Sequence, residues 1–157
     1  MRFKKIKLTK EGKVQAEYES RNAKSTMDEY SFSCGDEPKA SFRKAMDELA
    51  QDVIEICELP QDYLSRIRVS GVSLSWGGEN ETMGAVIIAY MILEESNNNL
   101  NLNTPHKTAE FYGATGDPKQ LLYPECVARI QILIAEASDY VKGIRAQANM
   151  FDQKINT

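Results

Sequence analysis

Two kinds of apolar spacing alternate along this chain, and their order restricts the folds open to it. Residues 5–8, 14–19 and 30–34 alternate apolar with polar side chains, which is the period of a half-buried strand. In residues 38–58 the apolar positions fall three and four apart, the spacing of a helix with one buried face. This part of the chain therefore predicts a strand hairpin, a third strand and a helix.

The rest of the chain repeats this order of elements. Strand patterns cover residues 67–76, 83–93 and 100–102, and helical spacing runs from 124 to 144. We therefore expect an α+β fold with a mainly antiparallel sheet and two amphipathic helices, an order compatible with a tandem βββα repeat. The side-chain parity of the first of these strands changes at Gly71, which predicts a β-bulge or a kink.

The pattern also predicts the core and the helix ends. Residues 83–93 are apolar on both faces, which indicates a central strand covered on two sides. Asp36 is expected to cap the first helix, with Pro38 in its first turn. The last helix should start near Pro124 and extend its buried stripe to Ile144. We expect the following residues in the core: Leu49, Val86, Ile88, Ile130 and Ile134.

A chain of 157 residues has the size of one domain, which we place at residues 1–146, with a C-terminal tail at 147–157. The net charge of −4 argues against a general DNA- or RNA-binding protein, although a local basic patch can coexist with it. No apolar run reaches the roughly 18 residues of a membrane-spanning helix, and the first residues do not form a signal peptide. The three cysteines form no CxxC pair, which favours free thiols and a cytoplasmic protein.

Residue types that carry chemistry are sparse. His106 is the only histidine, and with no CxxC to supplement it a zinc site lacks ligands. Catalysis by His106 with Cys126 would require the start of the last helix to lie against the histidine. The chain has no phosphate-binding glycine loop and no recognisable catalytic triad. We therefore predict a binding protein, without cofactor or metal, rather than an enzyme.

Polar side chains gather at the start of the long segment Thr104–Leu122, and loops of this length are often functional. An imidazole and an amine among amides could hold a phosphate or a small nucleotide, and a tryptophan in a neighbouring hairpin could stack on a base. The alternative is an ordinary strand exit beside a hairpin anchored by its tryptophan. The candidate ligand-binding residues are Trp76, Asn101, Asn103, Thr104, His106 and Lys107.

Basic residues also crowd the first strand and the turn after it. They could form a positive face that contacts nucleic acid directly. The alternative is the solvated side of an edge strand, where lysines discourage pairing with other chains. These residues are Arg2, Lys4, Lys5, Lys7, Lys10 and Lys13.

The tail carries a short motif, Gln147 followed three residues later by Met150 and Phe151. It resembles the peptide by which many bacterial DNA-processing proteins dock on the replication sliding clamp, whose usual pattern is Gln-Leu-Ser/Asp-Leu-Phe. Gln147 matches the polar anchor, and Met150 and Phe151 match the two apolar plugs. Ala148 and Asn149 depart from the pattern. The resemblance implies a bacterial sliding clamp as partner, and the alternative is that the tail packs back onto the domain.

Three stretches, ICELPQDY, VSGVSLSWGGENETMGA and LNLNTPHK, resemble a group of small bacteriophage proteins encoded near recombination and single-strand-binding genes. The resemblance implies a phage-type, non-enzymatic accessory protein of DNA replication or recombination in a bacterial host cell. The alternative is a counter-defence protein that sequesters a nucleotide signal through the Asn101–Lys107 loop and Trp76. An exposed tail favours the first function, and a closed polar pocket around His106 favours the second.

Overall fold

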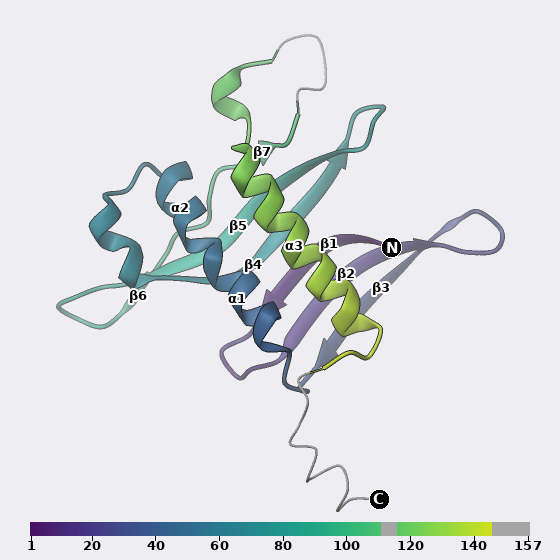
Figure 1. Ribbon diagram of the computed structural model, residues 1–157, viewed down its shortest axis with the longest axis horizontal. Helices are drawn as coiled ribbons and strands as arrows, with labels where there is room; N and C mark the ends of the chain where they lie inside the picture. The colour runs from purple at the N-terminus through teal and green to yellow at the C-terminus, as the bar shows by residue number, and fades with distance from the viewer. Residues whose placement is uncertain (111–115, 146–157) are drawn as a thin grey trace, which may run out of the picture.

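The computed structural model describes residues 1–110 and 116–145. These residues form an α+β fold in which helices cover one face of a seven-stranded sheet (Figure 1). The strands are β1 (Arg2–Leu8), β2 (Val14–Arg21), β3 (Met27–Cys34), β4 (Ile67–Gly77), β5 (Thr82–Ile92), β6 (Asn99–Asn101) and β7 (Lys107–Thr108). The helices are α1 (Ala40–Glu48), α2 (Ala50–Ile56) and α3 (Pro124–Val141), with short 3-10 turns η1 (Gln61–Arg66) and η2 (Pro118–Gln120).

The strands run antiparallel in the order β3-β2-β1-β4-β5-β6, and β7 pairs with β5. Each half of the chain thus contributes neighbouring strands, and the halves meet where β1 pairs with β4 from Lys5 to Lys7. The predicted bulge is confirmed, because the β4–β5 register shifts between Val69 and Gly71. The strand order is compatible with the tandem βββα repeat, which stays a prediction.

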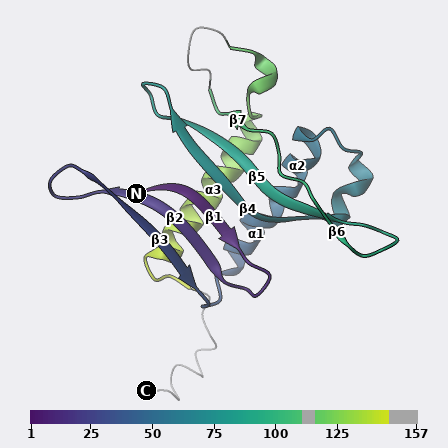
Figure 2. The same cartoon turned by 180° about the vertical axis from the view of Figure 1, so that it is seen from behind.

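One face of the sheet carries the hydrophobic core. Helices α1 and α3 lie side by side across this face, and Figure 2 shows the opposite face without a helix in front of it. Successive side chains along each strand alternate between the two faces of the sheet. The side chains directed at the helices include Phe3, Ile6, Val72, Leu74, Ile87 and Ala89, all of which are buried.

The first helix differs from the prediction in two ways. It begins at Ala40 with Lys39 at the N-cap and no side-chain cap, so the prediction of Asp36 as cap was wrong. The helix is also divided at Leu49, whose N–H bonds to the carbonyl of Met46 three residues back. This tighter turn separates α1 from α2 while Leu49 stays fully buried, as predicted.

Strand β5 is covered on one face only. Ile87 and Ala89 are buried beneath the helices, whereas Val86 and Ile88 on the other face are half-buried. The expectation of a strand covered on two sides was therefore wrong. In the pairing register Ile88 lies in the same cross-strand row as Lys7, and Val86 in the same row as Lys5, so the stems of lysines lie on this face in place of a second layer of helices.

Helix α3 confirms the predicted start at Pro124, but its buried face is rotated from the predicted one. Ile130 is buried and Ile134 is only half-buried, while Ile144 lies beyond the helix and is exposed. The residues buried along α3 are Cys126, Ile130, Leu133, Ala137 and Tyr140. Among the helices that the structure describes, none is long and apolar enough to cross a membrane.

Candidate functional site

The sheet face opposite the helices, which faces the viewer in Figure 2, is here called the open face. By strand alternation it carries mostly polar side chains. The pairing register places Lys7 beside Gly71 and Ile88 along one cross-strand row. A second row runs from Arg68 through Tyr90 to Asn101. Because directly paired residues project from the same side of a sheet, strands distant in sequence contribute to one polar surface.

A pocket of about 690 Å³ lies on this face, where the β1–β2 turn approaches the β5–β6 edge. Its volume falls within the roughly 300–1,000 Å³ typical of small-molecule sites. The described charged and polar side chains that line it come from five strands, from the β1–β2 turn and from the segment after β6. These are Lys7, Thr9, Lys10, Glu11, Gln15, Arg68, Ser70, Tyr90, Asn99, Asn101 and Asn103.

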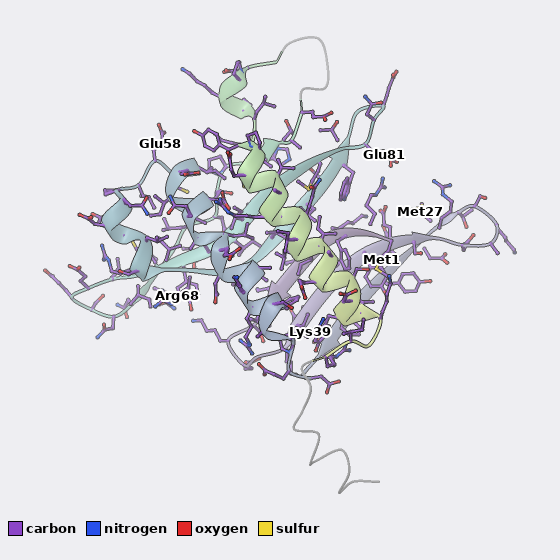
Figure 3. All side chains as sticks on the ribbon, viewed as in Figure 1. Met1, Met27, Lys39, Glu58, Arg68 and Glu81 are labelled. Carbon is purple, nitrogen blue, oxygen red and sulfur yellow. The ribbon has the colours of Figure 1, made fainter. Side chains whose placement is uncertain are left out.

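Among the residues that the structure describes, three cations border this pocket and outnumber the one carboxylate there, that of Glu11. Lys10 is exposed on the β1–β2 turn, and Lys7 is half-buried on β1. Arg68 projects at the start of β4, as Figure 3 shows. The Nη1 of Arg68 donates to the carbonyls of Ser65 and Ile67 at 2.7 and 3.0 Å, which fixes its guanidinium. The pocket is therefore a positively charged area on a chain whose total charge is negative.

An aromatic ring and a row of amides complete the pocket. The Nζ of Lys10 lies 5.5 Å from the centre of the Tyr90 ring, so the turn folds over this half-buried tyrosine. Asn99, Asn101 and Asn103 are exposed along the opposite rim. In the described part of the chain their side-chain amides make no hydrogen bond, so each can donate to and accept from a ligand.

His106 lies on the open face, at the other end of β5. Its Nε2 is 2.8 Å from the Oγ of Ser75, and its ring occupies the space above Gly84, where a Cβ would overlap it. Gly84 therefore provides the space for the imidazole. His106 does not line the pocket that contains Asn101 and Asn103, so the structure separates two parts of the predicted site.

Thr104 and Lys107 have structural partners. The Oγ1 of buried Thr104 accepts from the N–H of Ile87 at 2.8 Å, which continues the edge ladder past β6. The Nζ of Lys107 donates to the carbonyl of Lys119 at 2.8 Å and ties β7 to η2. Within the described part of the segment Thr104–Leu122, Lys107 and Thr108 thus extend the sheet edge, and Leu121, just after η2, forms a single bridge with Thr108.

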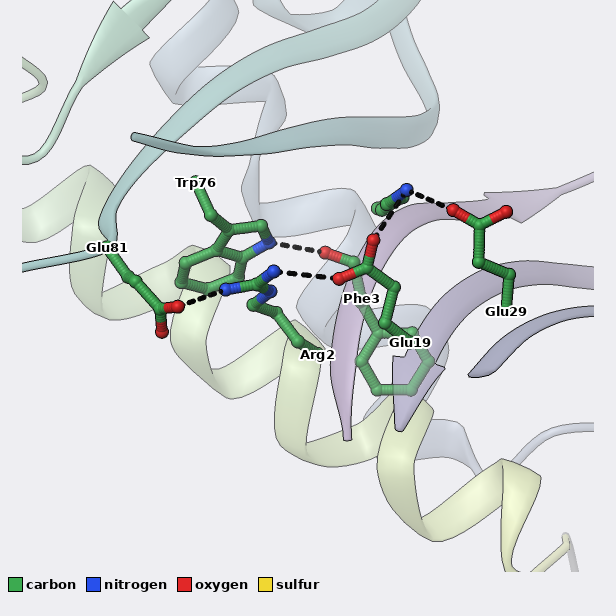
Figure 4. Close-up of polar contacts among 7 residues, drawn as sticks. Arg2, Phe3, Glu19, Glu29, Trp76 and Glu81 are labelled. Carbon is green, nitrogen blue, oxygen red and sulfur yellow. Dashed lines mark hydrogen bonds and ion pairs between the residues drawn. The ribbon is translucent and has the colours of Figure 1, made fainter. Parts of the chain in front are cut away.

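Trp76 projects from the face opposite to His106 and Ser75. Its Nε1 donates to the carbonyl of Phe3 at 2.9 Å, and the guanidinium of Arg2 lies 5.9 Å from its ring (Figure 4). Arg2 bridges Glu19 at 2.7 Å and Glu81 at 2.9 Å. This cluster joins the start of β1 to the β4–β5 hairpin, so Trp76 has a structural role and does not contribute to the pocket.

Lys4, the next basic residue of β1, also pairs with carboxylates. Lys4 contacts Glu19 at 2.6 Å and Glu29 at 2.9 Å. The cations Lys4 and Arg2 lower the pKa of Glu19. Arg2 and Lys4 are therefore neutralised by neighbours, whereas Lys7 and Lys10 belong to the pocket.

A second hollow, of about 730 Å³, lies between the α1–α2 junction and the start of β4. The carboxylates of Asp47 and Glu48 line it together with Arg68 and Arg129. Carboxylates repel phosphates, so this hollow is the poorer candidate for an anionic ligand. Within the residues described, no cluster of His, Cys, Asp and Glu could hold a metal ion.

The cysteines of the described structure are free thiols. Cys126 is fully buried beside Asp52, and burial together with this carboxylate raises the pKa of its thiol to about 12. A neutral, buried thiol is a poor nucleophile, and Cys126 makes no contact with His106 that would activate it. The dyad considered from the sequence is therefore not formed.

Comparisons with protein-family models, with curated proteins and with solved structures found no match for this chain. The tail residues Gln147, Met150 and Phe151 lie outside the described residues. The pocket residues that sequence reasoning missed include Arg68 and Tyr90. Alternation in β4 and β5 could have placed each on a strand face, but not beside the β1–β2 turn, because that neighbour comes from a distant part of the chain.

Proposed function

We propose that this chain is a non-enzymatic binding protein that holds an anionic nucleotide in the open-face pocket. The observation that carries the proposal is that Lys7, Lys10 and Arg68 line one pocket together with Tyr90 and the amides of the β5–β6 edge, with Lys10 over the Tyr90 ring. Lysine and arginine side chains supply positive charge for a phosphate. Asparagine amides can both donate to and accept from the edge of a base.

Tyr90 suits the base because every nucleobase has a flat face that can stack on an aromatic ring. The Lys10 ammonium already lies over this ring, so a base that replaces it would leave Lys10 free to contact the phosphate. In a phage-type protein of the host cytoplasm, such a pocket would sequester a nucleotide signal. The same pocket, with its net positive charge, also suits one nucleotide within single-stranded DNA or RNA. A comparison of free nucleotides with short oligonucleotides distinguishes these two ligands.

The test is a thermal-shift screen with nucleoside phosphates, cyclic mono- and dinucleotides, and short single-stranded oligonucleotides. A ligand at 100 times its Kd stabilises the fold by about 2.7 kcal/mol. In a domain of this size each kcal/mol raises Tm by about 2–4 °C, so the expected shift is roughly 5–11 °C. Lys10→Ala combined with Asn101→Ala should abolish it. Lys13→Ala, on the same turn but outside the pocket, is the matched control and should keep it.

The double variant His106→Ala with Lys107→Ala separates the two ends of the open face. It should retain the shift, because neither side chain lines the pocket. If this variant abolishes the shift and the Lys10–Asn101 variant does not, the ligand binds at the His106 end. If no nucleotide or oligonucleotide shifts the melting temperature of the parent protein, the nucleotide proposal is wrong.

A second candidate function concerns the tail. The residues Gln147, Met150 and Phe151 match the polar and apolar positions of sliding-clamp-binding peptides, and helix α3 ends at Val141, before the motif begins. A replication or recombination accessory protein of a phage would use this tail to dock on the clamp of its host. A peptide-sized contact of this kind can reach micromolar affinity, about −8 kcal/mol.

The docking function makes a separable prediction. Met150→Ala and Phe151→Ala should each weaken binding to purified bacterial clamp by about 2 kcal/mol or more, the scale of hot-spot residues. The melting temperature should not change, and Gln153→Ala, just after the motif, should behave as the parent. Titration of a labelled clamp measures the affinity. Absence of binding by the parent protein, or a large drop in melting temperature in either variant, would contradict docking.

A further inference from the structure

Strand β3 forms one edge of the sheet, visible at its margin in Figures 1 and 2. It pairs with β2 over its whole length, from Met27 to Cys34, without a register shift. No strand of the described structure pairs with its outer side. A long, regular edge of this kind is a template for pairing with another strand.

The turn before β3 determines which residues of this strand bond to β2 and which direct their backbone groups away from the sheet. The N–H of Asn22 donates to the carbonyl of Thr26 at 2.9 Å, which makes these two residues a hydrogen-bonded pair. In an antiparallel ladder such pairs recur at every second residue. Asp28, Tyr30 and Phe32 therefore bond inward to β2. The backbone N–H and C=O groups of Glu29, Ser31 and Ser33 consequently point outward.

The hydrogen bonds of the β1–β2 turn independently indicate the same outward-pointing residues on β3. The N–H of Thr9 donates to the carbonyl of Lys13 at 2.8 Å, so odd-numbered residues of β2 bond to β1. Even-numbered residues of β2 are left for β3, with Ala16 opposite Phe32. Both turns thus give the same set of outward groups on β3.

The side chains of β3 do little to prevent pairing. Edge strands are usually protected by lysine, proline or a bulge. Residues Met27 to Cys34 include no lysine, arginine or proline, and Figure 3 shows Met27 at the start of this strand. Glu29 is neutralised by the Nζ of Lys4 at 2.9 Å. Tyr30 is 45% exposed and stacks on Tyr18 with ring centres 5.1 Å apart.

We infer that β3 pairs antiparallel with β3 of a second copy of this chain, about a two-fold axis at Ser31. The outward hydrogen-bonding groups require odd-numbered residues to face odd-numbered ones. In this register Ser31 faces Ser31 of the partner, Glu29 faces Ser33, and Tyr30 faces Phe32 as a closely spaced aromatic pair. No carboxylate faces another carboxylate.

Neighbouring registers are poorer. A two-fold axis at Glu29 sets two carboxylates directly opposite each other, and like charges opposed across a ladder destabilise it. An axis at Tyr30 sets the carboxylate of Asp28 against the ring of Phe32. The register at Ser31 is self-complementary, which favours a second copy over an unrelated peptide. The joined sheets would carry the helices of both copies on one side and both open faces on the other.

Because the contact is a single pair of strands, the dimer should form in the micromolar range. Sedimentation velocity of the full chain across that range should show a concentration-dependent dimer. Ser31→Pro removes one outward N–H without removing a bond to β2, and it should raise the dimer Kd at least about tenfold. Ser31→Ala keeps the N–H and should dimerise as the parent does.

Amide hydrogen exchange gives a readout that does not depend on a variant. The N–H groups of Glu29, Ser31 and Ser33 should become protected as the protein concentration rises. Those of Asp28, Tyr30 and Phe32 should be protected at every concentration, because they bond to β2. A monomer up to about 1 mM, or a dimer in which the outward amides still exchange freely, overturns the inference.

Discussion

Removal of one partner of a buried ion pair should produce a large loss of stability with a defined pH dependence. The Nη1 of Arg129 on α3 donates to the Oδ1 of Asp52 on α2 at 2.7 Å. The Asp52 side chain is 1% exposed, and its Oδ2 has no hydrogen-bond partner in the described part of the chain. Arg129→Met leaves the carboxylate buried and unpaired, which costs about 3–5 kcal/mol. At about 2–4 °C per kcal/mol, Tm should fall by roughly 6–20 °C.

Two further variants isolate the cause. Asp52→Asn combined with Arg129→Met removes the buried charge and should recover much of the loss. Arg43→Met breaks the exposed pair with Glu37 on the surface of α1, where both side chains face solvent, and should cost at most about 1 kcal/mol. Urea unfolding at constant pH measures all of these differences, provided that the m-values agree.

The pKa of Asp52 gives the sign of the pH dependence. Burial raises this pKa above its ordinary value, and Arg129 opposes the rise. At a pH between the pKa of Asp52 in the unfolded chain and its higher pKa in the folded protein, the native state binds more protons than the unfolded state. The protonated Asp52 therefore contributes stability at low pH, and this contribution is lost as the pH rises through that range. Without Arg129 the folded pKa rises further and the range extends upward. The defect of Arg129→Met should therefore shrink from about pH 7 to about pH 4, and a defect that is small or independent of pH refutes this account.

Further predictions concern two glycines and the core of α3. Gly71→Ala places a Cβ against the backbone of β1, with the Cα of Lys7 at 3.0 Å, and should cost about 3 kcal/mol or more because backbone cannot yield. Gly84→Ala meets only the ends of side chains, so its cost in urea unfolding should be about 1 kcal/mol, with the His106 imidazole signals shifted in NMR spectra. Ile130→Ala should cost about 2–5 kcal/mol in thermal unfolding, whereas exposed Ile132→Ala should stay within about 0.5 kcal/mol.

Local pattern predicted the elements better than it predicted their surroundings. The bulge at Gly71 follows from a change of parity within one strand, and the start of α3 follows from Pro124 at its first turn. The local pattern could not predict whether helices cover one face of β5 or both. Val86 and Ile88 are apolar in either case, because lysine stems as well as helices can lie beside apolar side chains. The division at Leu49 has no glycine or proline to mark it.

The candidate site shows the same limit. Parity alone places Trp76 with Leu74, on the face opposite to Ser75, so this orientation of Trp76 was available from the sequence. The approach of Lys10 to Tyr90 was not, because it depends on how the β1–β2 turn lies over a strand from the other half of the chain. Contacts between distant segments follow from the strand order, which periodicity does not determine.

The short pairing between β1 and β4 has a consequence for the folding pathway. The hairpins β1–β2, β2–β3 and β4–β5 join residues close in sequence, and hairpins of this kind form in about 1–10 μs. The seam from Lys5 to Lys7 instead joins segments that lie far apart in the chain, and it must close a long loop for few hydrogen bonds. We therefore expect two preformed half-sheets to meet late, with α1 and α3 holding them together, and the docking of these half-sheets to set the folding rate.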